Sequence, residues 1–191
     1  KKRGGTLVVD EAFADADPEN CVAPYAGTKD APNLIVLRSL GKYFGLAGAR
    51  VGFILARREL LMQMVEVLGP WAVSGPSRAV AQGALADREW QAAARIRLAA
   101  DSERLRALLA PLGAPSAEVQ ATPLFCWLPT AQAQALHDLL AARGILVRLF
   151  AEIPGVRVGL PGSEPEWQRL AEALRGWLQT AVTPAKAGVQ N

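Results

Sequence analysis

The sequence has few of the side chains that build metal centres, disulfide scaffolds and histidine-dependent hydrolases. His137 is the single histidine, and Cys21 and Cys126 are the two cysteines. One imidazole and two widely separated thiols argue against a zinc site, and one histidine argues against a Ser-His-Asp triad. Two cysteines also fall short of the density seen in disulfide-stabilised domains. We therefore expect no metal site and two free thiols.

Long apolar runs and blocks of like charge are missing as well. No run of about 18 apolar residues occurs, so neither a transmembrane helix nor a membrane partner is predicted. The opening residues 1–13 lack the apolar length of a signal peptide, which predicts a cytoplasmic protein. The net charge of +3 comes from scattered arginines. This distribution suits an anionic ligand and does not indicate a nucleic-acid partner.

Short apolar runs alternate with helical patterns along the 191 residues, of which 51% are hydrophobic. Apolar runs bounded by polar or turn residues predict strands at 6–9, 34–37, 51–56, 124–128, 145–149 and 156–159. Helical spacing predicts helices at 57–68, 131–143 and 164–179, and one or two long helices over 77–112 with a bend at residues 87–88. The alternation indicates an α/β protein.

The order of these elements suggests two units with a long helix between them. We place the first unit at residues 1–76, the bridging helix and second unit at 77–179, and a disordered tail at 180–191, where periodicity is lost. The chain opens almost directly on a strand that reads as buried. Because a buried strand needs neighbours in its sheet, we expect further sequence upstream.

Lysines are scarce, which singles out one of them. The others are Lys1, Lys2, Lys29 and Lys186, whereas Lys42 follows an apolar strand in a glycine-containing turn. A desolvated lysine can act as a nucleophile that forms an imine. Ser39 lies three residues before it and Arg50 eight after it, and a hydroxyl with a guanidinium suits a phosphate group. Asp10 ends an earlier strand and offers a carboxylate.

The segment VVDEAF, followed by RSLGKYFGLAGARVGF, resembles the fold-type-I pyridoxal-phosphate (PLP) enzymes of aminotransferase class I/II. Within that class the chain resembles the histidinol-phosphate aminotransferase branch and, more narrowly, threonine-phosphate decarboxylases of cobalamin biosynthesis. The narrower likeness rests on DEAFAD, GPWAVSGPSRAVAQGALADREW and GILVRLFAEIPGVRVGLPG. It implies the aspartate-aminotransferase fold, with the C-terminal part of the large PLP-binding domain at 1–76 followed by the small domain.

The resemblance also implies roles for particular residues. Lys42 would bind PLP covalently and move protons, Asp10 would face the pyridine nitrogen, and Ser39 and Arg50 would bind the cofactor phosphate. Arg157, in VRVGL, matches the arginine that holds an anionic group of the substrate.

Arg148, in ILVRLF, is a candidate for a second anion such as a substrate phosphate. Two positions depart from the family pattern. Phe13 stands where a tyrosine often donates a hydrogen bond to the cofactor O3′, and Gly41 stands where a hydroxyl side chain often precedes the lysine.

The resemblance leads us to expect decarboxylation of L-threonine O-3-phosphate to (R)-1-amino-2-propanol O-phosphate. An aminotransferase acting on histidinol phosphate or a similar amino acid is the alternative, because the same residues serve both reactions. A third possibility is an inactive fragment or pseudo-enzyme, suggested by the short N-terminus and Phe13. The resemblance implies a phosphorylated amino-acid substrate and a homodimer.

Overall fold

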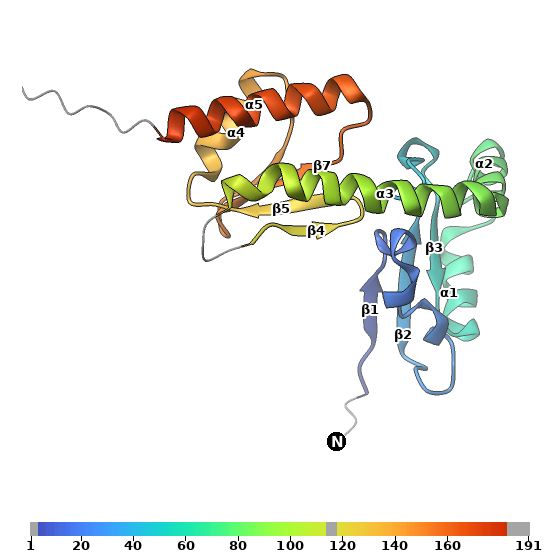
Figure 1. Cartoon of the computed structure of the whole chain (residues 1–191). Helices are drawn as coiled ribbons and strands as arrows, with labels where there is room; N and C mark the ends of the chain where they lie inside the picture. Colours follow the sequence, from blue (N-terminus) through green and yellow to red (C-terminus); the bar gives the residue numbers. More distant parts are fainter. Residues whose placement is uncertain (1–3, 114–117, 183–191) are drawn as a thin grey trace, which may run out of the picture. The chain divides into compact units, whose positions relative to one another are not determined.

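A computed structural model describes residues 4–113 and 118–182 of the chain (Figure 1). The chain divides into two compact units between Arg97 and Leu98, inside helix α3 (Arg88–Leu109). The domain limits expected at residues 76 and 179 stay predictions. Each unit contains a β-sheet with helices, which confirms the predicted α/β class.

The first unit is built on a three-stranded sheet with the order β1-β2-β3. Its strands are β1 (Leu7–Asp10), β2 (Leu34–Ser39) and β3 (Gly52–Leu55). Strands β1 and β2 are parallel, whereas β3 runs antiparallel to β2. The long loop expected between the first two strands contains three short 3-10 turns, η1 (Ala14–Ala16), η2 (Pro18–Asn20) and η3 (Ala23–Tyr25). These strands agree with the ranges predicted from the sequence.

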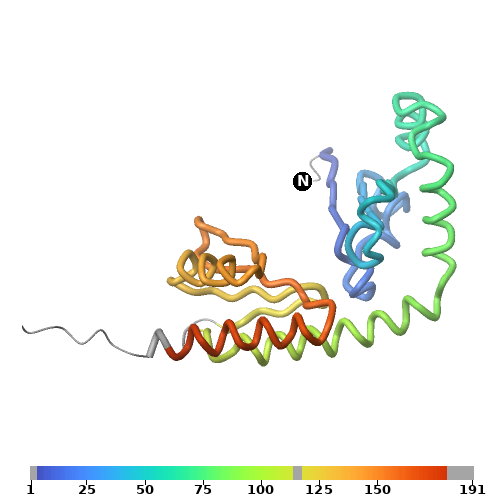
Figure 2. The backbone as a smooth tube through the Cα atoms, turned by 90° about the horizontal axis from the view of Figure 1, so that it is seen from above, coloured from blue at the N-terminus to red at the C-terminus, as the bar shows by residue number. Residues whose placement is uncertain are grey.

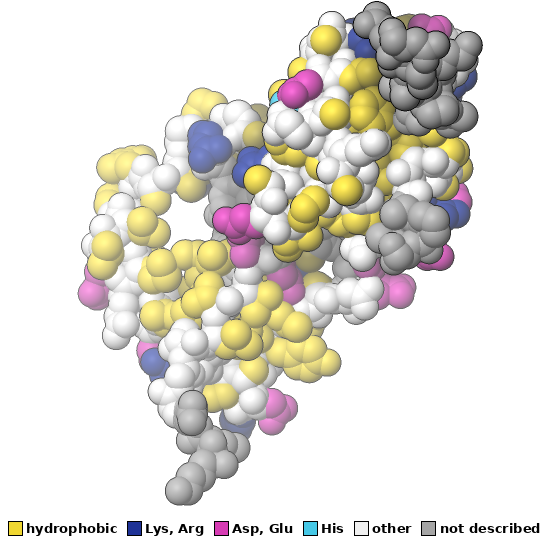
Figure 3. Space-filling model, turned by 90° about the vertical axis from the view of Figure 1, so that its left-hand side faces the viewer, with side chains coloured by type: hydrophobic (Ala, Val, Ile, Leu, Met, Phe, Trp, Pro, Cys, Tyr) yellow, Lys and Arg dark blue, Asp and Glu magenta, His cyan; other side chains and the backbone are white. Residues whose placement is uncertain are grey.

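The prediction that the first strand is buried is wrong for the described residues. Leu7 is 62% exposed and Val8 is 55% exposed, whereas Val36 in the middle strand is fully buried. The difference arises because β1 is an edge strand that pairs with β2 alone in the described parts of the chain. Hydrophobic side chains are visible on this unit in the lower half of Figure 3.

Helices follow the sheet as expected. They are α1 (Arg58–Leu68), α2 (Gly75–Ala86) and α3. The predicted bend lies between α2 and α3, where the Asp87 carboxylate accepts a hydrogen bond from the Trp90 backbone N–H at 2.9 Å and so caps α3. Ser74 caps α2 in the same manner by accepting from the Ser77 N–H at 3.3 Å.

The second unit has a four-stranded antiparallel sheet with the order β4-β5-β7-β6. Its elements are β4 (Gln120–Thr122), β5 (Phe125–Pro129), α4 (Ala133–Ala142), β6 (Arg148–Phe150), β7 (Gly155–Gly159) and α5 (Glu164–Val182), after the 3-10 turn η5 (Ala110–Leu112). The later half of α3 runs beside α5 (Figure 2). Arg104 on α3 forms an ion pair with Glu164 at 2.7 Å and its guanidinium lies 4.3 Å from the Trp167 ring centroid.

Three features of this unit differ from the sequence-based expectation. Strand β4 was not predicted, because its side chains are all exposed and show no apolar alternation. Strand β6 begins at Arg148 and not at Ile145, since the Ile145 N–H donates to the Leu140 carbonyl and closes the end of α4. Helix α5 continues through Val182, and the rest of the tail expected to be disordered lies outside the described residues.

The core of the second unit is formed by both helices and strands. Its fully buried members include Leu105 and Leu109 of α3, Leu128 of β5, Leu140 of α4 and Val156 of β7. These residues come from four elements, so the core closes only when all of them have formed.

Candidate active site

The site begins at the edge of the first sheet where two parallel strands end. Asp10 lies beside Leu37 in the register, and the next backbone N–H, of Glu11, donates to the Leu37 carbonyl at 2.8 Å. Because β1 and β2 run in the same direction, Asp10 and Ser39 terminate at the same edge. The Asp10 side chain is exposed and its Oδ1 accepts from the Ala12 N–H at 3.0 Å.

A tight turn carries Lys42 away from the end of β2. The Gly45 N–H donates to the Lys42 carbonyl at 3.0 Å, and Gly45 has a φ of 68°, which glycine adopts without steric cost. The Leu46 N–H donates to the Leu40 carbonyl at 2.9 Å. The Lys42 side chain is exposed, so the described residues do not supply the desolvation that the sequence interpretation invoked.

A cavity of about 300 Å³ brings together three of the candidate residues, Ser39, Lys42 and Arg50. Its remaining lining is small or apolar: Gly41, Leu46, Ala47, Val51 and Gly52. The cavity thus presents an amine, a guanidinium and a hydroxyl, which are hydrogen-bond donors that suit a phosphate. Asp10 does not line this cavity. At Gly41, one of the two positions that depart from the family pattern, the backbone N–H donates to the Ser39 Oγ at 3.4 Å.

Arg50 has an unusual backbone. Its φ of 52° and ψ of 42° are left-handed, and among the described residues it is the one non-glycine position with positive φ. Such a conformation is an outlier for a bulky side chain, and outliers of this kind concentrate at functional sites. Its Nη1 donates to the Ala47 carbonyl at 3.2 Å.

Phe13 contacts the lysine directly. The Lys42 ammonium lies 5.3 Å from the centroid of the Phe13 ring, within the range of a cation–π interaction. The segment that follows Asp10 therefore reaches Lys42 through an aromatic ring, at the position where the family often has a tyrosine hydroxyl.

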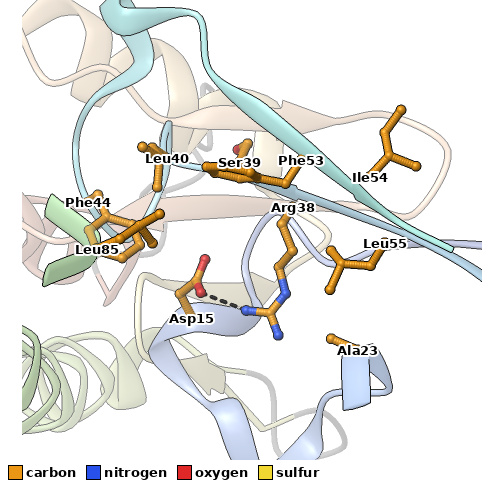
Figure 4. Close-up of a pocket in the computed structure, with 10 residues that line it drawn as sticks. All are labelled: Asp15, Ala23, Arg38, Ser39, Leu40, Phe44, Phe53, Ile54, Leu55 and Leu85. Carbon is orange, nitrogen blue, oxygen red and sulfur yellow. Dashed lines mark hydrogen bonds and ion pairs between the residues drawn. The ribbon is translucent and has the colours of Figure 1, made fainter. Parts of the chain in front are cut away.

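An ion-pair network that the sequence did not reveal fixes this segment. Buried Glu11 accepts hydrogen bonds from the Val22 N–H and from Arg38 Nε, the latter at 3.0 Å. Arg38 Nη1 donates to Asp15 at 2.6 Å, and both side chains line a second, mostly apolar cavity of about 370 Å³ (Figure 4). The sequence holds one clue to this network. A glutamate follows Asp10 directly and an arginine precedes Ser39 directly, at the ends of two neighbouring parallel strands. The network ties the two segments that carry Asp10 and Ser39.

Arg148 and Arg157 belong to the second unit. They are register partners on β6 and β7, so their side chains leave the same face of that sheet. The Arg157 guanidinium lies 4.9 Å from the Phe125 ring centroid, and the Arg148 guanidinium lies 5.5 Å from the Phe150 ring centroid. The arrangement offers two cations on one aromatic-lined surface.

The family model for aminotransferase class I and II matches residues 1–174. The chain belongs to the aminotransferase class I and II family. PLP is the cofactor of this family. The amine, guanidinium and hydroxyl of the cavity fit a phosphorylated aldehyde of that kind.

Several members of the family are similar to this chain. Threonine-phosphate decarboxylase of Pseudomonas aeruginosa is 50% identical over 181 residues, covering 95% of this chain and 53% of that protein. Histidinol-phosphate aminotransferase of Roseiflexus castenholzii is 35% identical over 157 residues, covering 78% of this chain and 40% of that protein. The chain therefore spans about half the length of the relatives it matches.

A solved structure supports the fold assignment. Histidinol-phosphate aminotransferase from Sinorhizobium meliloti, in complex with pyridoxal-5'-phosphate, matches with a TM-score of 0.79 at 24% identity, covering 92% of this chain and 49% of that one. The predicted aminotransferase fold is thereby confirmed.

None of the described helices is both long enough and apolar enough to cross a membrane. The cytoplasmic location expected from the sequence stays a prediction.

Proposed function

We propose that this chain provides the lysine side of a PLP site in an enzyme that decarboxylates L-threonine O-3-phosphate. The observation that carries the proposal is the single cavity lined by Ser39, Lys42 and Arg50. The choice of substrate follows the 50% identity to a threonine-phosphate decarboxylase. The product would be (R)-1-amino-2-propanol O-phosphate, an intermediate suited to cobalamin biosynthesis.

Each cavity residue has a part in this proposal. The Arg50 guanidinium and the Ser39 hydroxyl bind the cofactor phosphate, and Lys42 holds the cofactor covalently through Nζ. When bound, PLP supplies an electron-withdrawing ring that accepts the electrons left at the substrate Cα. Asp10 would keep a proton on the ring nitrogen. The Lys42 amine, released from the cofactor when the substrate amine takes its place, would deliver a proton to Cα after carbon dioxide has left.

The substrate's anionic groups are assigned to the second unit. Arg157 binds its carboxylate and Arg148 its phosphate, because guanidinium groups bind both anions in a bidentate manner. Support comes from their shared sheet face. The test is binding of threonine phosphate to Arg157→Lys and Arg148→Lys variants. Lysine keeps the positive charge but cannot form the paired hydrogen bonds that a guanidinium makes to one anion.

An assay of the two products decides between the reactions. Carbon dioxide release from threonine phosphate, without any need for a keto acid, supports the decarboxylase. Keto-acid-dependent amino transfer from histidinol phosphate supports the alternative. That alternative is motivated by the 35% identity to a histidinol-phosphate aminotransferase.

The remaining alternative is a chain that holds no cofactor. PLP is added, the adduct is reduced with borohydride, and the modified peptide is located by mass spectrometry. Cofactor fixed on Lys42, and lost in Lys42→Ala, rules out a chain unable to bind PLP.

We also propose that the whole protein is a homodimer, as the resemblance implies. Exposed apolar side chains on α1 and after it support an interface in the first unit, with Val67 87% and Trp71 85% exposed. Sedimentation of the wild type and of a Trp71→Ser variant tests this, because a dimer held by that surface shifts toward monomer in the variant.

A further inference from the structure

The residue after the candidate lysine faces the opposite way from it. Lys42 is exposed and lines the cavity, whereas Tyr43 is 5% exposed. The Tyr43 hydroxyl donates a hydrogen bond to the backbone carbonyl of Gln91 on α3. The turn that presents Lys42 is therefore attached to a helix 48 residues further along the chain.

Aromatic contacts hold the Tyr43 ring on the same surface. The ring meets Phe44 edge-on at 4.9 Å and Trp90 at 5.5 Å, and Phe44 in turn stacks on Trp90 at 5.8 Å. The Arg95 guanidinium lies 5.5 Å from the centroid of the Tyr43 ring. Burial raises the pKa of the Tyr43 phenol, although Arg95 opposes the shift, so the hydroxyl remains a hydrogen-bond donor.

Gln91 makes this attachment point rigid. Its side chain is buried, and Nε2 donates to the carbonyls of Ala84 and Leu85 at 3.0 and 3.1 Å. Arg88 Nη1 donates to Gln91 Oε1 at 3.3 Å. Because these bonds join the end of α2 to the start of α3, the carbonyl that receives Tyr43 sits on a fixed junction and not on a loop.

We infer that Tyr43 is a positioning residue, which anchors the Lys42 turn to the α2–α3 junction so that Lys42 keeps its place in the cavity lining with Ser39 and Arg50. The Cα atoms of adjacent residues lie in one peptide plane, so fixing the Tyr43 side chain restricts where the Lys42 side chain can point. The backbone of the turn has few other long-range ties, because its bonds run mainly within residues 40–51. The inference rests on the proposed function of Lys42.

The matched variants are Tyr43→Phe and Ser102→Ala. Tyr43→Phe keeps the aromatic ring and removes only the bond to Gln91. Ser102→Ala removes another buried hydroxyl, which donates to the Thr122 carbonyl at 2.7 Å in the second unit. Both changes delete one buried hydrogen bond, so a loss of stability alone affects them alike.

The measurement is the rate at which PLP becomes fixed to Lys42 in the full chain, trapped with borohydride and read by mass spectrometry. Exposed Lys29 in the same sample serves as the internal reference, and the melting temperature of each variant is recorded. We expect the Lys42-to-Lys29 ratio to fall about three- to tenfold in Tyr43→Phe, the factor that loss of one hydrogen bond allows, and to stay constant in Ser102→Ala.

The outcomes separate the two ideas. Preferential labelling of Lys42 in the wild type together with an unchanged ratio in Tyr43→Phe overturns the positioning role of Tyr43 alone. An equal fall in Ser102→Ala also overturns it, since stability then explains the effect. Equal labelling of Lys42 and Lys29 in the wild type overturns the proposed function, and the role of Tyr43 with it.

Discussion

Replacing Arg50 by glycine should separate its backbone strain from its proposed contact with phosphate. Arg50 has φ 52° and ψ 42°, a conformation that costs an L-residue about 1–2 kcal/mol and costs glycine almost nothing. Glycine also lowers the free energy of unfolding by about 0.5–1 kcal/mol, because it makes the unfolded chain more flexible. Loss of the exposed bond to the Ala47 carbonyl costs about 0.5 kcal/mol. These terms nearly cancel, so the free energy of unfolding should change by less than about 1 kcal/mol.

Cofactor binding should respond differently. A hydrogen bond to a charged group contributes about 1.5–3 kcal/mol, so Arg50→Gly should weaken PLP binding about ten- to hundredfold. Arg50→Ala is the control, because alanine also lacks the guanidinium but keeps the left-handed strain. It should bind PLP as weakly as Arg50→Gly and be about 1 kcal/mol less stable. Denaturant unfolding without cofactor and a PLP titration measure the two quantities.

Two results would refute this reasoning. A PLP affinity of Arg50→Gly within about threefold of the wild type would show that Arg50 does not bind the phosphate. Equal unfolding free energies for the glycine and alanine variants would show that the left-handed conformation costs no more than the about 0.5–1 kcal/mol that glycine loses through its unfolded chain, and would refute the larger strain.

Two further predictions concern the second unit. Gly155→Ala should lower the free energy of unfolding by about 1–3 kcal/mol, because the new Cβ would lie 2.3 Å from the Trp127 ring. Gly159→Ala on the same strand is the control in denaturant titrations, because its Cβ would meet no atom within 4 Å. Burial raises the pKa of the Cys126 thiol, so iodoacetamide should modify Cys21 in the native protein and reach Cys126 only after denaturation; equal native rates, read by mass spectrometry, would contradict this.

Much of the site was accessible from local sequence patterns. The strand at Leu34–Ser39, the turn with Lys42 and the strand at Gly52–Leu55 follow from short apolar runs separated by glycines. The helix break at Asp87 followed from a polar pair that caps one helix as the previous one ends. The resemblance to the family is carried by the local motif that holds Ser39, Lys42 and Arg50, and the match to the family model confirms it.

Other parts of the site depend on contacts between distant segments. The burial of β1 could not be predicted from its apolar residues alone, because exposure depends on which strands and helices lie beside the strand. The ion pair of Glu11 with Arg38 spans 27 residues, and no periodicity predicts such a pairing.

The sequence by itself determined that Lys42 stands between two strands, with Ser39 and Arg50 at fixed spacing. Only the tertiary structure decided that these three side chains line one cavity, that Arg50 is left-handed, and that Tyr43 is bonded to Gln91. The physical reason is range. Propensity and periodicity act over one or two turns, whereas a cavity and a buried hydrogen bond form where segments far apart in the chain meet.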